Sequence, residues 1–294
     1  MPKISVGIPV YNAELYIAQA IQSVLDQSFC DFELIITDDA STDRTPEIIN
    51  KFSDSRIRYC LNPKQLGPPG NFNRCIELSA GEYISVFHAD DIMLRENLEK
   101  KKNFLDQNPD AGMVHSNFYR MNAGNQTVED PALLPFKKDA VMNGQDVFKI
   151  MSGDINYICA SSVMVRKKCF DEIGAFEVSL AHTCDWEMWL RLGLFYKIGY
   201  LSEALIGYRK HEAMHSSLFW NNLRGIQEYY AAKHSVLKKF PEKVPEREEF
   251  SKKIRILSSR KALDLFRSQL KEGNISEGFR TFLYFIRQNF FSHD

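Results

Sequence analysis

Two adjacent carboxylates, Asp90 and Asp91, are the residues of this chain best suited to hold a metal ion. They follow Tyr83 to Phe87, a mostly β-branched and aromatic run that predicts a buried strand. Ligands of open α/β sheets lie just beyond the carboxyl ends of the strands, and carboxylate oxygens suit Mg²⁺ or Mn²⁺, which hold diphosphates next to protein acids. Taken alone, the pair is equally consistent with a helix N-cap, because a helical pattern follows from Met93.

The elements that must position these acids alternate between strand and helix. The strands are continuous apolar runs, which predicts a mainly parallel sheet covered by helices on both faces. No glycine-rich phosphate-binding loop follows the first strand, so we expect a cation to meet phosphate charge. The predicted strands are Ile4 to Val10, Phe32 to Thr37, Arg56 to Leu61 and Tyr83 to Phe87, and the predicted helices are Ala13 to Gln27, one beginning near Thr42, and Phe72 to Ser79.

The later part of the chain continues the pattern and then becomes helical. Asn62 to Asn71 and Asn122 to Asn143 are rich in Gly, Pro and Asn and predict loops, the second a lid or substrate-reading segment. We expect a first domain at residues 1–217 and a helical region at 218–294. The further predicted elements are helices at Arg95 to Phe104 and Asp185 to Leu194, strands at Gly112 to Tyr119, Ile158 to Val165 and Tyr200 to Tyr208, and tail helices at Leu223 to Phe240, Phe250 to Leu270 and Ile275 to Phe290.

The composition is that of a soluble globular protein, with 44% hydrophobic and 26% charged residues. A formal net charge of −1 without a dense Lys/Arg block argues against nucleic acid as a partner. The six cysteines are scattered, no signal peptide is evident, and no apolar run reaches the length of a bilayer. We therefore expect reduced thiols and a cytoplasmic location.

The last predicted helix carries a stripe of apolar residues, for which two interpretations remain. The favoured one is a helix packed on the main domain. The other is peripheral contact with the inner face of a membrane, in which Arg280 and Arg287 would accompany exposed phenylalanines. The stripe consists of Ile275, Phe279, Phe282, Leu283, Ile286 and Phe290.

Five short motifs occur in a familiar order. They are PVYN at Pro9 to Asn12, TDDAS at Thr37 to Ser41, GEYISVFHADD at Gly81 to Asp91, CDWEMWLRL from Cys184, and YRKH from Tyr208. Over about residues 3 to 217 this chain resembles an inverting family 2 glycosyltransferase of the GT-A fold. The resemblance implies a Rossmann-like, mainly parallel sheet flanked by helices, with a C-terminal helical appendage.

The resemblance also implies where a nucleotide-diphospho-sugar, with UDP as the expected nucleotide, would bind. Asp39 matches the acid that accepts a hydrogen bond from the base, although it is also a candidate helix cap. Arg74, next to Asn73, lies in a segment near the donor and is a candidate phosphate contact. The implied nucleotide-binding residues are Pro9, Tyr11, Asn12, Asp39, Arg74 and Asp91, the last through water or ribose.

For a Mn²⁺ or Mg²⁺ cofactor the resemblance implies Asp90 and His211 as ligands. His88 stands where the first acid of the family motif usually is, so it either takes part in the site or fills space at the strand end. Arg209 and Lys210 are candidates to offset the charge of the leaving group, or else solvated surface cations.

Asp185 matches the catalytic base, and Cys184 replaces the acid that usually precedes it. An inverting transfer needs one base to take the acceptor proton, and a helix start favours an ionised carboxylate. An N-cap role for Asp185 is compatible with catalysis. Trp186 is a candidate to stack on an acceptor sugar, whereas Trp189 is assigned to the core.

These features together predict transfer from a UDP-sugar to the hydroxyl of a saccharide, a lipid-linked acceptor or a protein, in polysaccharide or glycoconjugate synthesis. Two alternatives remain. His88 and Cys184 also fit a catalytically silent protein that binds sugar nucleotides or glycans. A sugar nucleotidyltransferase has less support, because no glycine-rich basic loop follows the first strand.

Overall fold

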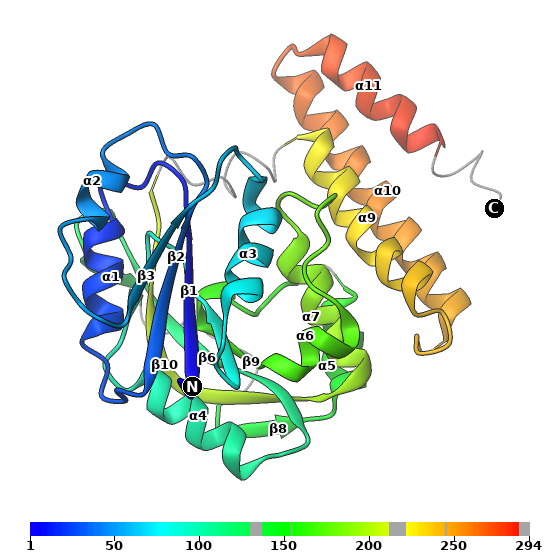
Figure 1. The fold of residues 1–294 in the computed structure, drawn as a ribbon. Coiled ribbons are helices and arrows are strands. Elements are labelled where there is room, and N and C mark those ends of the chain that lie inside the picture. The colour runs from blue at the N-terminus through cyan, green and yellow to red at the C-terminus, as the bar shows by residue number, and fades with distance from the viewer. Residues whose placement is uncertain (130–136, 154, 212–221, 245, 288–294) are drawn as a thin grey trace.

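The computed structural model describes residues 1–129, 137–153, 155–211, 222–244 and 246–287 (Figure 1). The strands are β1 Ile4–Val10, β2 Phe32–Asp38, β3 Ile57–Leu61, β4 Tyr83–Val86, β5 Ile92–Met93, β6 Ala111–Met121, β7 Thr127–Glu129, β8 Ala140–Met142, β9 Val163–Arg166 and β10 Lys197–Arg209. The helices are α1 Ile17–Leu25, α2 Thr45–Ile49, α3 Gly67–Leu78, α4 Asn97–Gln107, α5 Gly144–Met151, α6 Lys167–Ile173, α7 Cys184–Phe195, α9 Leu223–Lys239, α10 Arg247–Lys271 and α11 Ile275–Ile286, with a 3₁₀ turn, η1, at Ala160–Ser162.

The strands form one sheet in the order β3-β2-β1-β4-β9-β6-β10-β5, with β7 beside β6 and β8 beside β10. β1 is parallel to β2 and β4, β2 is parallel to β3, and β6 is parallel to β10. Because β9 is antiparallel to both β4 and β6, the six strands β1–β4, β6 and β10 run in one direction. Their carboxyl ends therefore share one edge of the sheet, which confirms the predicted mainly parallel architecture.

Several boundaries differ from the predictions. α3 begins at Gly67, inside a predicted loop, because Pro68 and Pro69 occupy the first helical positions, where a missing N–H costs nothing. The predicted strand from Ile158 is instead η1 followed by β9. The predicted loop at 122–143 contains β7 and β8, and its residues 130–136 lie outside the described part. The short elements β5, α5 and α6 were not predicted.

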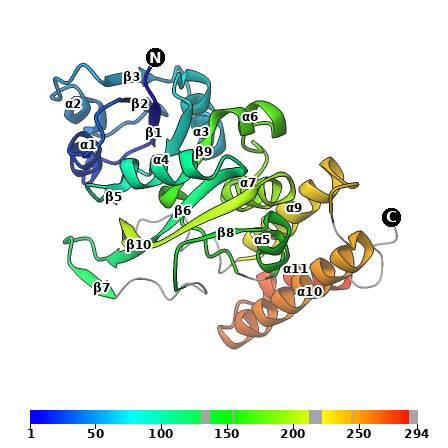
Figure 2. The same ribbon diagram turned by 90° about the horizontal axis from the view of Figure 1, so that it is seen from below.

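Apolar side chains fill both faces of the sheet. One core lies among the sheet, α1 and α4, and the other lies among the sheet, α5, α6 and α7 (Figure 2). Tyr229, Ala232 and Val236 of α9 belong to the second core. The core therefore continues across the predicted boundary between 217 and 218 and includes Phe250 and Ile254 of α10, whereas the rest of α10 and α11 extend away from the sheet (Figures 1 and 2).

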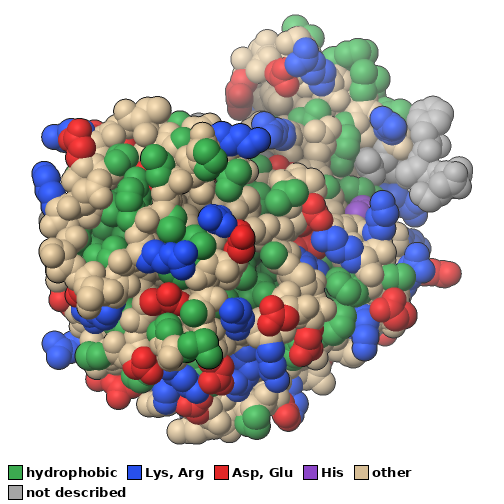
Figure 3. All heavy atoms as spheres, in the orientation of Figure 1, with side chains coloured by type: hydrophobic (Ala, Val, Ile, Leu, Met, Phe, Trp, Pro, Cys, Tyr) green, Lys and Arg blue, Asp and Glu red, His purple; other side chains and the backbone are tan. Residues whose placement is uncertain are grey.

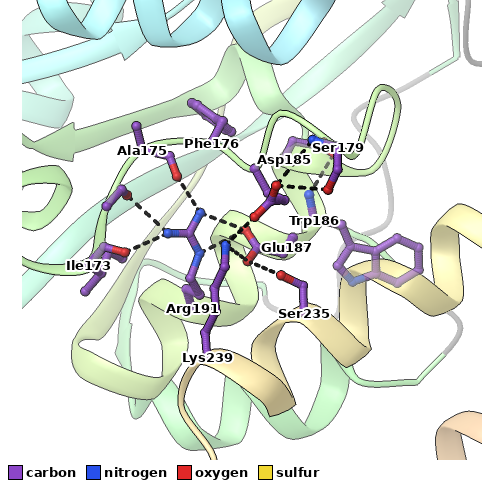
Figure 4. A network of polar contacts seen from close by, with 12 residues as sticks. Ile173, Ala175, Phe176, Ser179, Asp185, Trp186, Glu187, Arg191, Ser235 and Lys239 are labelled. Atoms are coloured by element: carbon purple, nitrogen blue, oxygen red, sulfur yellow. Dashed lines mark hydrogen bonds and ion pairs between the residues drawn. The ribbon is translucent and has the colours of Figure 1, made fainter.

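A buried ion pair lies inside α7. Arg191 Nη2 is 2.7 Å from Glu187 Oε2, and the two side chains are 2% and 0% exposed. Arg191 also donates to the carbonyl oxygens of Ile173, Gly174 and Ala175, so it ties α7 to the end of α6 (Figure 4).

Replacing Arg191 by methionine should lower the free energy of unfolding by about 3 kcal/mol, because it leaves the buried carboxylate of Glu187 without its main partner. Urea denaturation measures this loss. Arg267→Met is the matched control, since its ion pair with Asp264 is exposed and should contribute less than about 1 kcal/mol. Equal losses in the two variants would contradict the assignment.

Candidate active site

Acidic and imidazole groups from distant parts of the chain meet at the carboxyl edge of the sheet. Possible ligand atoms of His88, Asp90 and Asp91 lie within 4.8 Å of one another, just after β4. His211, which follows β10, places Nε2 3.1 Å from Asp90 Oδ2. β9 and β6 lie between β4 and β10 in the sheet, so the parallel direction of β4 and β10 is what brings these segments to one edge.

Asp90 is the carboxylate of this cluster most open to a ligand, with 30% of its side chain exposed. Burial acts to raise its pKa, but the hydrogen bond with His211 and the nearby His88 outweigh this effect and hold the pKa of Asp90 below its ordinary value. Asp90 therefore stays ionised, as a metal ligand must.

Asp91 is buried and already has protein partners. It accepts hydrogen bonds from Ser161 Oγ of η1 and from the backbone N–H of Arg209, the latter at 2.9 Å. Burial, followed by the charge of Asp90, raises the pKa of Asp91 to about 8. With 1% of its surface exposed, Asp91 joins β4 to η1 and β10. The contact of Asp91 with the nucleotide stays a prediction. Such a contact would require Ser161 or Arg209 to move, because Asp91 is covered by them.

Arg209 holds the backbone of the acidic turn. Its Nε donates to the carbonyl oxygen of Asp90 at 2.6 Å, and one Nη donates to Gln19 Oε1 at 3.0 Å. The guanidinium lies 4.7 Å from the ring centre of Tyr16, whose ring is 4.9 Å from that of His211. Arg209 is 1% exposed, so its interpretation as a solvated cation was wrong. Lys210, in contrast, is exposed.

His88 belongs to the cluster, and one of its ring nitrogens is buried. Its Nε2 is buried and has no hydrogen-bond partner among the described residues. The ring stacks on Phe72 with centroids 5.7 Å apart, and the backbone N–H donates to Ser161 Oγ at 3.2 Å. A buried nitrogen without a partner costs free energy, which a cation would offset. The open carboxylate of Asp90 is a donor that suits Mn²⁺ or Mg²⁺, whereas imidazole is a softer ligand.

Asp185 lies in the first turn of α7 and is half-buried. Oδ1 accepts from the N–H of Trp186 at 2.7 Å, and Asn156 Nδ2 lies 3.5 Å from Oδ2. Burial raises the pKa of Asp185, against the lowering effects of the hydrogen bond from the Trp186 N–H and of His88. α7 begins at Cys184, so Asp185 is within the helix and is not its N-cap.

The turn after β1 is tied to the turn after β2. Asn12 has a φ of +48°, its N–H donates to Ser41 Oγ at 3.0 Å, and its Oδ1 accepts from the N–H of Thr42 at 2.8 Å. Pro9 is paired with a residue of β2, and Tyr11 is 43% exposed. The Tyr11 ring is thus open to a stacked base, and the nucleotide contacts of Pro9, Tyr11 and Asn12 stay predictions.

Asp39 supports the start of α3. Its carboxylate accepts from the N–H groups of Leu66 at 2.7 Å and Gly67 at 2.9 Å, and from Asn62 Nδ2 at 3.1 Å. It therefore caps α3, which begins more than 25 residues later in the chain. The capping alternative assumed the helix that directly follows Asp39, which is α2. The contact between Asp39 and a nucleobase stays a prediction.

The amino-acid sequence matches a known family over most of this structure. The family model described as "Glycosyl transferase family 2" matches residues 5–174, which is more than half of the 294 residues. The chain belongs to glycosyl transferase family 2.

Two relatives and one solved structure illustrate the likeness. An uncharacterized glycosyltransferase of Haemophilus influenzae is 42% identical over 120 residues, 40% of this chain and 48% of the relative. The GalNAc(5)-diNAcBac-PP-undecaprenol beta-1,3-glucosyltransferase of Campylobacter jejuni is 30% identical over 186 residues, 61% of this chain and 59% of that protein. The crystal structure of S. aureus TarS 1-349 with UDP-GlcNAc has a TM-score of 0.74 at 20% identity, covering 97% of this chain and 81% of that one. These likenesses confirm the predicted family and GT-A fold.

In this family 2 chain, two residues of the predicted donor segment already have protein partners. Arg74 pairs with Glu77 at 2.7 Å on the exposed side of α3, beside a hollow of about 400 Å³. Within the described chain, no hydrogen bond joins Arg74 to the other candidates. Asn73 exchanges two hydrogen bonds with the backbone of Phe176, so it serves the fold.

The two tryptophans of the CDWEMWLRL segment are both in the core, each 3% exposed. Trp186 Nε1 donates to the carbonyl oxygen of Met151 at 2.9 Å, and its ring packs 4.8 Å from that of Tyr229. The prediction that Trp186 stacks on an acceptor was therefore wrong, whereas the core position of Trp189 is confirmed. Because α7 is buried on both sides, its hydrophobic periodicity does not show which of its residues face the core.

Several residues that shape the candidate site were not predicted from the sequence. Ser161 is one of them, and its hydroxyl bridges the backbone of His88 and the carboxylate of Asp91. The sequence did not indicate that Arg209 is buried and bonded to the carbonyl oxygen of Asp90. It also did not indicate that Asn156 contacts Asp185. These roles depend on contacts between residues 29 to 119 positions apart.

Proposed function

We propose that this chain transfers a sugar from a nucleotide-diphospho-sugar, with a UDP-sugar as donor, to an acceptor hydroxyl with inversion. The observation that carries the proposal is the convergence of His88, Asp90 and His211 at one sheet edge, and Asp185 in the first turn of α7 is the proposed base. Membership of the family supports sugar transfer. The donor, the stereochemistry and the metal rest on the site residues.

Asp185 is the base of the proposed reaction. It takes the proton of the acceptor hydroxyl as that oxygen forms a bond to the anomeric carbon. The bond from this carbon to the diphosphate oxygen breaks on the opposite side, and its electron pair leaves with UDP. One displacement of this kind inverts the anomeric centre. The first turn of α7 favours the ionised form of Asp185, because a helix N-terminus attracts negative charge.

In this proposal the diphosphate binds at the turn after β4 that carries Asp90 and Asp91. Asp90 and His211, with His88 beside them, would hold Mn²⁺ or Mg²⁺, and a bound ion of this kind would neutralise charge on the departing diphosphate. Arg209 keeps the carbonyl oxygen of Asp90 fixed and so holds the turn in shape. Asp91 does the same through its bonds to Ser161 and to the backbone of Arg209.

A panel of nucleotide-sugars with Mn²⁺ tests the function. A donor that binds the native state should raise the melting temperature, and the same donor should release UDP slowly in water. A raised melting temperature without UDP release would favour the silent binding protein. Formation of a nucleotide-sugar from a sugar phosphate and UTP would favour a nucleotidyltransferase, and the absence of all three responses would reject the proposal.

For the acceptor we propose a lipid-linked saccharide in glycoconjugate or polysaccharide synthesis, at the cytoplasmic face of a membrane. The name of the similar Campylobacter jejuni protein states such an acceptor, an undecaprenol-linked oligosaccharide. Undecaprenol-linked and free oligosaccharides of the same structure, offered with the active donor, distinguish a lipid-linked acceptor from a free saccharide. A protein acceptor would instead give a labelled polypeptide.

The C-terminal helices support contact with an anionic lipid surface. On α11 an outer stripe is open, with Ile275 71%, Phe279 60% and Leu283 51% exposed. α11 packs on α10 through its other face. The favoured prediction, that this helix packs on the main domain, was therefore wrong about its neighbour. Residues 250–287 carry nine Lys or Arg against three Asp or Glu. Figure 3 shows hydrophobic and basic side chains, with some acidic ones, on α10 and α11. No helix of the described residues is long and apolar enough to cross a membrane.

Phe279→Glu should lower partitioning onto phosphatidylglycerol vesicles by about tenfold or more, because a buried phenylalanine contributes about 1.5–3 kcal/mol. Co-sedimentation measures the partitioning. Ser276→Glu, which adds the same charge to an exposed position of α11, should have a smaller effect. Equal partitioning of wild type and Phe279→Glu would contradict the lipid contact.

A further inference from the structure

Helix α9 contacts the segment that leads into the helix of the proposed base. Glu228 Oε2 accepts hydrogen bonds from the backbone N–H groups of His182 at 2.7 Å and Thr183 at 3.2 Å. Thr183 Oγ1 donates in return to the carbonyl oxygen of Glu228 at 3.3 Å. Glu228 is 9% exposed, so its carboxylate forms hydrogen bonds with the protein and has little contact with solvent.

α9 also holds α7 one turn further on. Ser235 Oγ lies 3.3 Å and Lys239 Nζ 3.4 Å from Glu187 Oε1, the carboxylate that pairs with Arg191 (Figure 4). Lys233 Nζ donates to the carbonyl oxygen of Ser152 at 2.9 Å and lies 5.0 Å from the ring centre of Trp186. The start of α7 is therefore fastened to α9 on both sides of Asp185.

The start of α7 needs such a partner. Thr183 is the N-cap residue, and its side chain makes no capping hydrogen bond to the helix. N–H groups at a helix start carry partial positive charge, which a nearby carboxylate stabilises. Glu228 supplies that carboxylate from outside the helix, two residues before Asp185.

We propose that Glu228 is a positioning residue for Asp185. It fixes the backbone at 182–183, and with it the direction in which the Asp185 carboxylate meets the acceptor hydroxyl. The assignment rests on the proposed function. A displacement of about 1 Å at a reacting group costs about 10²-fold in rate, so a change at Glu228 reaches the chemical step without touching the donor. The helical region after residue 222 thereby becomes part of the catalytic unit.

Glu228→Ala in the full chain should lower kcat at least tenfold while leaving the KM for the donor and the affinity for UDP unchanged. Glu228→Gln should lie between Glu228→Ala and wild type, because an amide oxygen still accepts both hydrogen bonds but carries no charge. Gln227→Ala, at an exposed neighbour on the same helix, is the matched control and should behave as wild type. If Glu228→Ala does not fold, Glu228→Gln carries the test.

Hydrogen exchange gives a readout that does not depend on activity. The amides of residues 182–186 should exchange faster in Glu228→Ala, and those of β1 should not. Unchanged exchange at 182–186, or a kcat within twofold of wild type in both variants, would overturn the assignment. A loss of UDP affinity in step with kcat would also overturn it, since that pattern indicates general loss of structure. A wild-type protein without transfer would reject the proposed function itself, whereas a transferring wild type with unaffected variants rejects the role of Glu228 alone.

Discussion

Asp185→Asn should lower transfer by about 10²–10⁴-fold while UDP binds as tightly as before. The amide has nearly the same shape and can still accept the hydrogen bond from the N–H of Trp186, so the start of α7 should keep its structure. It cannot take a proton from the acceptor. Product formation with a labelled donor measures the first effect, and calorimetry with UDP measures the second.

Asp171→Asn, at an exposed position of α6, is the control for this variant and should transfer normally. The base acts only when ionised, and burial raises the pKa of Asp185 above its usual value of 3.8. Wild-type kcat should therefore fall, as the pH is lowered, at a higher pH than an ordinary aspartate would give. Turnover by Asp185→Asn within threefold of wild type would remove Asp185 from the mechanism.

Asp90→Ala should remove the metal dependence of UDP binding and reduce transfer by about 10²-fold or more. Asp90 is the ionised and partly exposed acid of the cluster, and its loss also frees His211 from its partner. Calorimetry of UDP binding with and without Mn²⁺ measures the dependence. Wild type should bind UDP more tightly with Mn²⁺, whereas the variant should bind equally in both conditions.

Asp90→Asn separates charge from shape, because its amide can still form a hydrogen bond with His211. We expect it to resemble Asp90→Ala, since the ion requires a carboxylate. Glu96→Ala, which removes an acid from the exposed residue before α4, should keep the full Mn²⁺ effect. An unchanged Mn²⁺ effect in both Asp90 variants would show that the ion binds elsewhere.

Much of the candidate site was predictable, because apolar runs in the sequence indicate where strands end. The apolar runs before Asp39 and Asp90 identified β2 and β4, and the parallel direction of those strands placed their ends at one edge. The meeting of Asp90 and His211, 121 residues apart, follows from the same rule once β10 is counted among the parallel strands.

The predictions failed where a residue's role depends on what covers it. Trp186 and Arg209 have side chains suited to a ligand, but both are buried against residues from other elements. The capping alternative for Asp39 named the helix that follows it, whereas its carboxylate accepts hydrogen bonds at the start of α3. A sequence shows which residues can donate, accept or carry charge, but it does not show which partners already satisfy them.

The family, the direction of the main strands, and the acids and histidines at the strand ends could be derived from short motifs and local hydrophobic periodicity. Which of those groups stay open to a ligand depends on the folded protein. It left Asp90 partly exposed, closed Asp91 between Ser161 and Arg209, and set Glu228 against the segment before Asp185. The physical reason is that burial and hydrogen-bond partners arise from contacts between residues far apart in the chain, which no local pattern encodes.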